Sequence, residues 1–274
     1  MKVDLHTHST ISDGRLTPAE LLREAESRGI ELFSITDHDS VDAYSKIGQL
    51  EHAGVRLIHG IEFSTAWQGI GIHIVGLNVD IDCQVLGNGI ALQRKARMER
   101  AQRISDKLDK LGMENTWKRV QEIAGQSVIG RPHFAQCLVE SGKVKNENEA
   151  FKRYLGPGKT GDIKCLWMSM EQTIHCITDS GGIAVLAHPS SYRLTNTRLA
   201  RLLDDFASCG GVAMEVISGQ QTREVTEKLA RLCQLKDLYA SSGSDFHRPG
   251  QAWSELGGQA SLPVACKPVW ELWP

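Results

Sequence analysis

The segment Val3-Asp4-Leu5-His6-Thr7-His8 is a short apolar run that ends on two histidines. Similar imidazole and carboxylate groups recur at the ends of later apolar runs, and the full set is His6, His8, Asp13, His38, Glu62, His73, His188, Asp245 and His247. These are the ligand types of divalent cations such as Zn²⁺, Mn²⁺ and Fe²⁺. Nine ligands are too many for one ion, so the sequence predicts a metal cluster, an arrangement suited to phosphate hydrolysis.

Seven short apolar runs rich in β-branched residues predict strands, at residues 3–8, 32–38, 56–64, 71–79, 182–189, 211–218 and 239–247. Helical patterns separate most of them, which indicates parallel pairing and an α/β fold. Most candidate ligands lie at or just beyond the C-terminal end of a run; His73 is the exception, near the start of its run. Side chains that converge from many strand ends are typical of the catalytic face of a barrel. We therefore expect a distorted seven-stranded (β/α) barrel.

Residues 86–162 interrupt this alternation with helical patterns at 93–111, 116–124, 132–141 and 147–155. The segment holds 15 Lys and Arg against 9 Asp and Glu, a net charge of +6, whereas the whole chain has a net charge of −2. We expect residues 1–85 and 163–274 to form the barrel and 86–162 to form a helical lid that attracts a phosphate-rich ligand. The turn Gly156-Pro157-Gly158-Lys159-Thr160-Gly161 is expected to expose backbone N–H groups to a phosphate.

Composition narrows the class of protein further. A chain of 274 residues that is 41% hydrophobic can bury one substantial core. Its seven cysteines include no Cys-x-x-Cys pair, which favours free thiols in a reducing compartment. No apolar run approaches the roughly 18 residues of a membrane span, and no signal segment is recognised. We expect a cytoplasmic protein without membrane contact; its protein partners stay unknown.

The same residues resemble the PHP (polymerase and histidinol phosphatase) family along nearly the whole chain. The matching blocks are Asp4-Leu5-His6-Thr7-His8-Ser9, Ile35-Thr36-Asp37-His38-Asp39, Gly60-Ile61-Glu62-Phe63-Ser64, His73-Ile74-Val75-Gly76-Leu77, Ala187-His188-Pro189 and Gly243-Ser244-Asp245-Phe246-His247. The resemblance implies three divalent ions, with Mn²⁺ expected and Fe²⁺ or Zn²⁺ as alternatives. By that resemblance one ion binds His6, His8, Glu62 and Asp245; a second binds Glu62, His73 and His188; a third binds Asp13, His38 and His247. Glu62, Asp13 and His247 are then the expected catalytic residues.

Within that family the insertion resembles the branch of bacterial 3′,5′-nucleoside bisphosphate phosphatases, which includes a 5′-to-3′ exoribonuclease. The matching blocks are Arg131-Pro132-His133-Phe134-Ala135 and Tyr154-Leu155-Gly156-Pro157-Gly158-Lys159-Thr160-Gly161. The resemblance implies nucleoside 3′,5′-bisphosphates and 5′-phosphorylated RNA as substrates. Arg131, Lys159 and Arg193 are the candidates for a second phosphate, since Arg offers a bidentate fork and Lys a point charge. The branch usually has Gly-Arg-Tyr where this chain has Ser190-Ser191-Tyr192, and an aromatic residue where it has Asp162.

Two other functions share the ligand set. One is a histidinol-phosphate phosphatase and the other a non-catalytic PHP module that binds metal.

The sequence leaves open the roles of two further carboxylates. Asp39 is expected to orient His38 or a water, and Glu215 faces either the centre of the barrel, as a supporting residue, or a helix.

Overall fold

The computed structural model describes residues 1–48, 54–164 and 167–273, so His52 and Cys165 lie outside the described residues. The chain divides into two compact units. The first unit comprises Met1–Ile90 and Met168–Pro274, and the second comprises Ala91–Trp167. Helix α3 (Gln84–Asp109) begins in the first unit and ends in the second.

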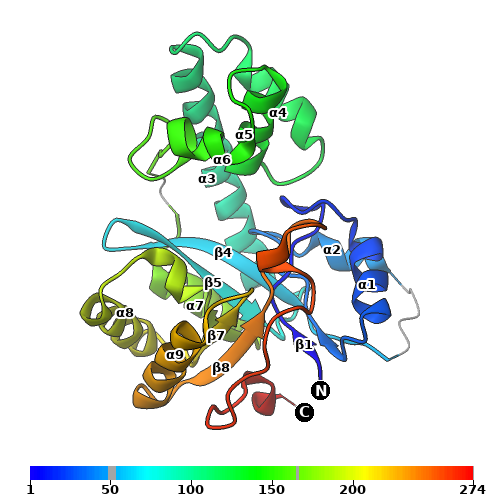
Figure 1. Cartoon of the computed structure of the whole chain (residues 1–274), viewed down its shortest axis with the longest axis vertical. Helices are drawn as coiled ribbons and strands as arrows, with labels where there is room; N and C mark the ends of the chain where they lie inside the picture. Colours follow the sequence, from blue (N-terminus) through cyan, green and yellow to red (C-terminus); the bar gives the residue numbers. More distant parts are fainter. Residues whose placement is uncertain (49–53, 165–166, 274) are drawn as a thin grey trace. The chain divides into compact units, whose positions relative to one another are not determined.

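The first unit has a mixed α/β fold with two sheets (Figure 1). The smaller sheet is parallel and has the order β1 (Val3–Asp4), β2 (Leu32–Phe33), β3 (Arg56–Leu57). The larger sheet has the order β4 (Gly60–Trp67), β5 (Ile70–Leu77), β6 (Ile183–Leu186), β7 (Ala213–Ser218), β8 (Tyr239–Gly243). Two isolated parallel bridges, Thr7 to Phe246 and His38 to Glu62, connect segments of the two sheets.

The strand pairing differs from the all-parallel barrel that the sequence led us to expect. The run at 56–64 splits into β3 and β4, and strand β5 is antiparallel to both of its neighbours. The cause is the connection between β4 and β5, which consists of Gln68 and Gly69 alone. Both residues have positive φ, 47° and 80°, as a two-residue hairpin turn requires. So short a turn makes a parallel crossover impossible, because parallel neighbours need a connection of a dozen residues or more.

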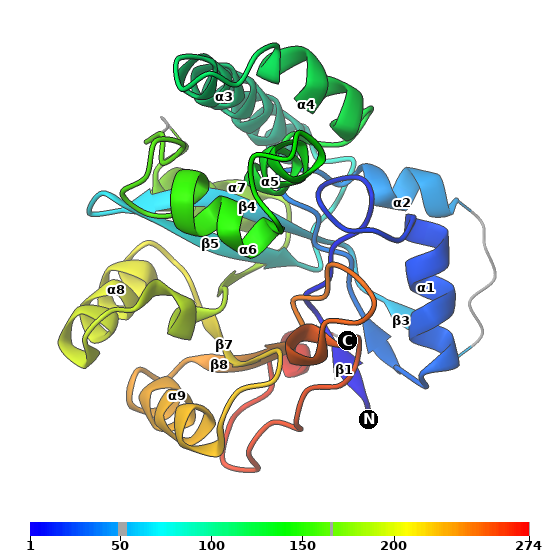
Figure 2. The same ribbon diagram turned by 45° about the horizontal axis from the view of Figure 1, so that its top comes forward.

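Three hydrophobic clusters hold the first unit together. One contains Leu5 and Leu32 from the small sheet and Val75 and Val185 from the large one, so the two sheets share a core. A second packs the large sheet against helices α7 (Met170–Asp179), α8 (Asn196–Ser208) and α9 (Arg223–Leu235). The third packs β2 against helices α1 (Pro18–Ser27) and α2 (Asp42–Ile47). Figure 2 shows these two groups of helices beside their respective sheets.

The second unit has a hydrophobic core of its own. Its helices are the C-terminal part of α3, α4 (Thr116–Ala124), α5 (Arg131–Glu140) and α6 (Glu147–Ala150), followed by a π-helical turn at Phe151–Leu155. Ile104 and Leu108 of α3 are buried against Phe134 and Leu138 of α5. None of the helices in residues 1–48, 54–164 and 167–273 is both long and apolar enough to cross a lipid bilayer. The six cysteines that the structure describes are all free thiols.

The hydroxyl of Tyr44 hydrogen-bonds to backbone groups just after β2 and at the start of β4. It accepts the Gly60 N–H at 2.6 Å and donates to the Ile35 carbonyl at 2.6 Å. Replacing Tyr44 with Phe leaves these buried backbone groups unpaired, so we expect the free energy of unfolding to fall by about 1–3 kcal/mol. Urea unfolding followed by circular dichroism measures this change. Tyr239→Phe is the control, and an equal loss in both variants would contradict a specific role for the Tyr44 hydroxyl.

Candidate metal centre

Glu62 lies at the centre of the histidine-rich site. Its side chain is 1% exposed, and imidazole nitrogens surround its two oxygen atoms. The nitrogens are those of His73 (Nδ1, 2.8 Å), His38 (Nδ1, 2.8 Å), His188 (Nε2, 3.0 Å), His6 (Nε2, 3.4 Å) and His8 (Nε2, 3.4 Å). Five histidines from four chain segments thus meet at one carboxylate.

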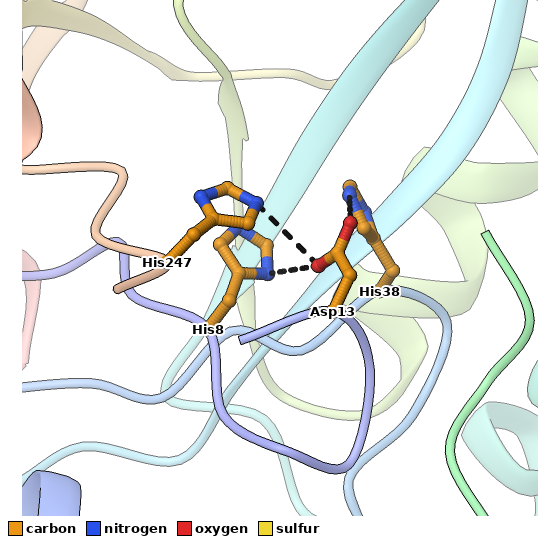
Figure 3. Close-up of side chains that lie close together, drawn as sticks. All are labelled: His8, Asp13, His38 and His247. Atoms are coloured by element: carbon orange, nitrogen blue, oxygen red, sulfur yellow. Dashed lines mark ion pairs between the residues drawn. The ribbon is translucent and has the colours of Figure 1, made fainter. Parts of the chain in front are cut away.

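Two aspartates extend the site on either side of His8. Asp13 has one oxygen 3.4 Å from Nε2 of His247 and 3.8 Å from Nδ1 of His8, and its other oxygen is 3.7 Å from Nε2 of His38 (Figure 3). Asp245 Oδ1 lies 3.3 Å from Nε2 of His8. All nine residues expected as ligands are therefore brought together.

The position of His73 near the start of its strand, the exception in the sequence pattern, follows from the direction of β5. Because β5 is antiparallel to β6, its N-terminal half lies beside the C-terminal end of β6. The Ala187 N–H donates to the His73 carbonyl at 3.2 Å, which places His73 next to His188. A ligand near the start of an antiparallel strand thus reaches the same edge as ligands at the ends of parallel strands.

Close backbone approaches allow the ligand segments to converge. A Cβ atom on Gly243 would lie 2.3 Å from the Cβ of His6, and one on Gly14 would lie 2.2 Å from the carbonyl oxygen of His8. Real Cβ atoms do not approach other atoms so closely, because packed interiors leave no room for such overlap. These two positions therefore require glycine for the neighbouring segments to come together.

Asp37 fixes the loop that carries Asp13, although the sequence analysis did not single it out. Its carboxylate is fully buried and accepts the Ser9 N–H at 2.8 Å, the Ser9 hydroxyl at 2.6 Å and the Ser12 hydroxyl at 2.6 Å. Three such bonds restrain the turn between Ser9 and Asp13. The only signal in the sequence was its place beside His38 in the block Thr36-Asp37-His38-Asp39.

Tyr192 is a second supporting residue that sequence reasoning missed. Its hydroxyl accepts the His73 N–H at 2.9 Å and donates to the Ala187 carbonyl at 2.8 Å. It therefore links the backbones that carry His73 and His188. Burial raises the pKa of this hydroxyl well above its usual value, so it stays protonated and able to donate.

Glu215 and Asp39 have defined partners as well. Glu215 faces the metal centre and not a helix, because its Oε1 lies 2.6 Å from Nδ1 of His6. Asp39 accepts the Ser64 N–H at 2.9 Å and so links its own segment to the strand β4 that carries Glu62. Its expected role in orienting His38 or a water stays a prediction.

The electrostatics of the site keep the carboxylates of Glu62, Asp13 and Asp245 ionised. Burial alone favours the neutral form of Glu62, but His73 and His38 outweigh it and hold the pKa of Glu62 well below its usual range. At His247 burial alone would lower the pKa of the imidazole, but the adjacent Asp13 outweighs burial and raises this pKa to about 10. At His8 burial wins, reinforced by His247, and lowers the pKa to about 3. The site thus balances buried negative charge with protons on only some of its imidazoles.

The donor set fits divalent cations. Glu62 Oε2 and His38 Nδ1 are buried 2.8 Å apart, and neither has a hydrogen-bond partner in the described part of the chain. His6 and His8 direct their Nε2 atoms at each other across 3.1 Å. Lone pairs that converge in this way are what a cation of the Mn²⁺, Fe²⁺ or Zn²⁺ type binds, displacing the protons that otherwise share the space. Three groups have donor atoms within 4.8 Å of one another: His6, His8 and Asp245; His38, Glu62 and His73; His8, Asp13, His38 and His247.

The three candidate phosphate-binding residues fall in different units. Arg193 is exposed and has a positive φ of 51°, directly after the 3₁₀ turn Pro189–Tyr192 that follows His188. Arg131 begins α5 in the second unit, where its guanidinium donates to the Leu155 carbonyl at 3.3 Å. Lys159 is exposed in the same unit.

The turn around Lys159 does not present the N–H groups that the sequence led us to expect. Four of its amides already donate to neighbouring acceptors: Gly156 to the Phe151 carbonyl (2.8 Å), Gly158 to Oδ2 of Asp162 (2.8 Å), Lys159 to the Gly156 carbonyl (3.0 Å) and Gly161 to the Tyr154 carbonyl (2.6 Å). The expectation of exposed amides was wrong for these four, because the turn satisfies its own backbone groups. These four amides are therefore not available to a phosphate, and the Lys159 side chain supplies the positive charge of the turn.

Comparison with known proteins identifies relatives over the full chain. The 5′-3′ exoribonuclease Rnm of Escherichia coli is 42% identical over 98% of this chain and 93% of its own length. The 3′,5′-nucleoside bisphosphate phosphatase of Chromobacterium violaceum is 37% identical over 98% of this chain and 95% of its own length. Among solved structures, an amidohydrolase from Chromobacterium violaceum with bound sulfate and no metal is 36% identical, with a TM-score of 0.91 over 99% of this chain and 95% of the other.

A family model supports the same grouping from the N-terminal part of the chain. The PHP domain matches residues 4–100, which include His6, His8, Asp13 and Glu62. The relatives and the solved structure extend the likeness through the segments that carry His188 and Asp245. Sequence, fold and ligand geometry agree, and the chain belongs to the PHP domain family.

Proposed function

We propose that this protein is a divalent-metal-dependent phosphoesterase that removes the 3′-phosphate of 3′,5′-nucleoside bisphosphates. We propose further that it degrades 5′-phosphorylated RNA from the 5′ end, including ribosomal RNA 5′ ends. The observation that carries this proposal is the convergence of the nine candidate metal ligands, Glu62 among them, in one site. The names of two relatives, an exoribonuclease and a bisphosphate phosphatase, supply the substrate class.

One bond joins the two activities. An exonuclease that releases a 5′-mononucleotide and leaves a new 5′-phosphate must break the bond between phosphorus and the 3′-oxygen. Removal of the 3′-phosphate from a 3′,5′-bisphosphate breaks the same bond. A single site that holds a 5′-phosphate and hydrolyses the next phosphate along therefore performs both reactions.

We propose three ions, with Mn²⁺ as the expected metal. His6, His8, Glu62 and Asp245 would hold one; Glu62, His73 and His188 a second; Asp13, His38 and His247 the third. Such ions provide a nucleophile near neutral pH and stabilise negative charge on the phosphoryl oxygens. One observation bears on this grouping: Nδ1 of His38 lies 2.8 Å from Glu62, whereas its Nε2 lies 3.7 Å from Asp13, so His38 could contribute to either neighbouring site.

Residues of this chain would position the ions and the substrate for the reaction. The ionised carboxylate of Glu62 belongs to the ligand groups of the first two proposed ions and would compensate the positive charge of both ions. Asp13 and His247 lie 3.4 Å apart and would position the third ion beside the phosphate. Arg193, Arg131 and Lys159 would bind the second phosphate of the substrate by charge.

We also infer that the two sheets act as one distorted ring of seven segments, with β3 outside it. Support comes from the Leu5 N–H, which donates to the Ser242 carbonyl at 3.0 Å and joins the end of β1 to β8. Across the other junction, the Glu62 N–H donates to the Asp37 carbonyl at 3.2 Å. A ring of this kind explains how all the ligand-bearing ends reach one place.

Glu62→Gln tests whether this carboxylate bridges two ions. The substitution keeps the size of the side chain but removes the charge, so metal and phosphatase activity should be lost together. We expect metal affinity to fall more than about 100-fold, since even outer-sphere partners of metal ligands cost 10- to 100-fold. Elemental analysis and turnover of a 3′,5′-bisphosphate measure both effects. Near-normal turnover with full metal content would show that Glu62 does not bridge.

The rate of RNA degradation is predicted to depend on the chemical group at the 5′ end. A charge-assisted contact to phosphate contributes roughly 1.5–3 kcal/mol, or about ten- to a hundred-fold in rate or affinity. RNA with a 5′-hydroxyl should therefore be degraded more slowly by that factor than the same RNA with a 5′-monophosphate. Lys159→Ala and Arg131→Ala should narrow the difference without changing metal content.

The matched control is Lys110→Ala, which removes an exposed positive charge from the same unit. This variant should retain the full preference for a 5′-phosphate. Equal rates on both 5′ ends in the wild-type protein would refute phosphate anchoring and leave the basic charge of the second unit as a solvated surface.

A further inference from the structure

Glu215 of β7 is a buried carboxylate outside the proposed ligand set. Its side chain is 1% exposed. Oε1 lies 2.6 Å from Nδ1 of His6, and Oε2 accepts the backbone N–H of His188 at 2.6 Å. These partners follow different strands, β1 and β6, and both belong to the proposed ligand set. One carboxylate thus contacts two ligand residues at once, through separate oxygen atoms.

The contact with His6 determines which ring nitrogen is free. A carboxylate oxygen at hydrogen-bond distance requires a proton on Nδ1, because an ionised carboxylate can only accept. In the neutral ring, the form that binds a cation, the other nitrogen, Nε2, then carries the lone pair. It points into the site, 3.4 Å from Glu62 and 3.5 Å from Asp245. Histidine ligands commonly donate their second nitrogen to a carboxylate, which fixes the ring and makes it a better ligand.

The contact with His188 acts on the backbone. His188 has φ 27° and ψ 57°, a left-handed conformation that residues other than glycine rarely adopt. Pro189 follows it, which disfavours helical backbone at the preceding residue. The Glu215 oxygen holds the N–H in this conformation. As a result the His188 ring is turned so that its Nε2 lies 3.0 Å from Glu62.

We propose that Glu215 is a positioning residue that fixes the tautomer of His6 and the backbone of His188, so that the Nε2 atom of each ring faces the proposed metal cluster. This inference rests on the proposed metal-dependent function. It requires a carboxylate and not an amide, because both partners are donors. Glutamine has one acceptor oxygen, and its NH₂ group would face a second donor.

The test compares three variants with the wild-type protein. Glu215→Gln keeps the volume and removes one acceptor. Glu215→Asp keeps both acceptors on a shorter side chain, which reaches only one partner well. Glu271→Gln makes the same chemical change at an exposed position as a control. Bound Mn²⁺ is measured by elemental analysis, its dissociation constant by competition with a chelator, and folding by circular dichroism and thermal unfolding.

We expect Glu215→Gln to bind Mn²⁺ about 10- to 100-fold more weakly than wild type. Glu215→Asp should fall between the two, and Glu271→Gln should match wild type. A folded Glu215→Gln variant with wild-type Mn²⁺ affinity would overturn the proposal. If that variant does not fold, Glu215→Asp decides, and wild-type affinity in it would overturn the proposal equally.

The same measurements separate this inference from the proposed function. A wild-type protein that binds no Mn²⁺ would contradict both. A wild-type protein that binds Mn²⁺, loses it on Glu215→Gln and hydrolyses neither a 3′,5′-bisphosphate nor 5′-phosphorylated RNA would contradict the proposed function alone. In that case the positioning role of Glu215 would stand.

Discussion

The buried, ionised carboxylate of Glu62 is the constraint on which the first unit depends. Removing an ion from water costs several kcal/mol even after the protein relaxes, so such a group needs opposite charge nearby. Five imidazoles within 3.4 Å supply it in part, through the protons that some of them carry. Those protons and divalent cations compete for the same lone pairs, which links metal binding to the charge balance of the site.

The fold satisfies this constraint by bringing strand ends of the two sheets together. Glycine at positions 14 and 243 lets ligand-bearing segments approach to distances that a Cβ atom would forbid. The antiparallel direction of β5 places His73 beside His188 at the common edge. Around these residues, the side chains of Asp37, Tyr192 and Glu215 restrain the backbones that carry the candidate ligands. Ligand geometry is therefore set as much by backbone hydrogen bonds as by the ligands themselves.

The sequence was sufficient to name the nine candidate ligands but not the residues that position them. Imidazole and carboxylate at the ends of apolar runs are a local pattern, and all nine candidates do converge. Glu215 and His6 are 209 residues apart, so nothing in the neighbourhood of either one reveals their contact. The direction of β5 was missed for a different reason: Gln68-Gly69 is a weak turn signal, and the regular alternation of strands and helices outweighed it. The amides around Lys159 were misjudged because a glycine-rich turn can bond to itself.

The central claim is that Glu62 is shared between two cations in a cluster of three. Anomalous diffraction from crystals grown with Mn²⁺ tests it most directly, because it locates each ion independently of the side chains around it. The account predicts three anomalous peaks among the nine ligand residues, two of them in contact with the Glu62 carboxylate. A single peak, or several peaks whose ligands exclude Glu62, would contradict it.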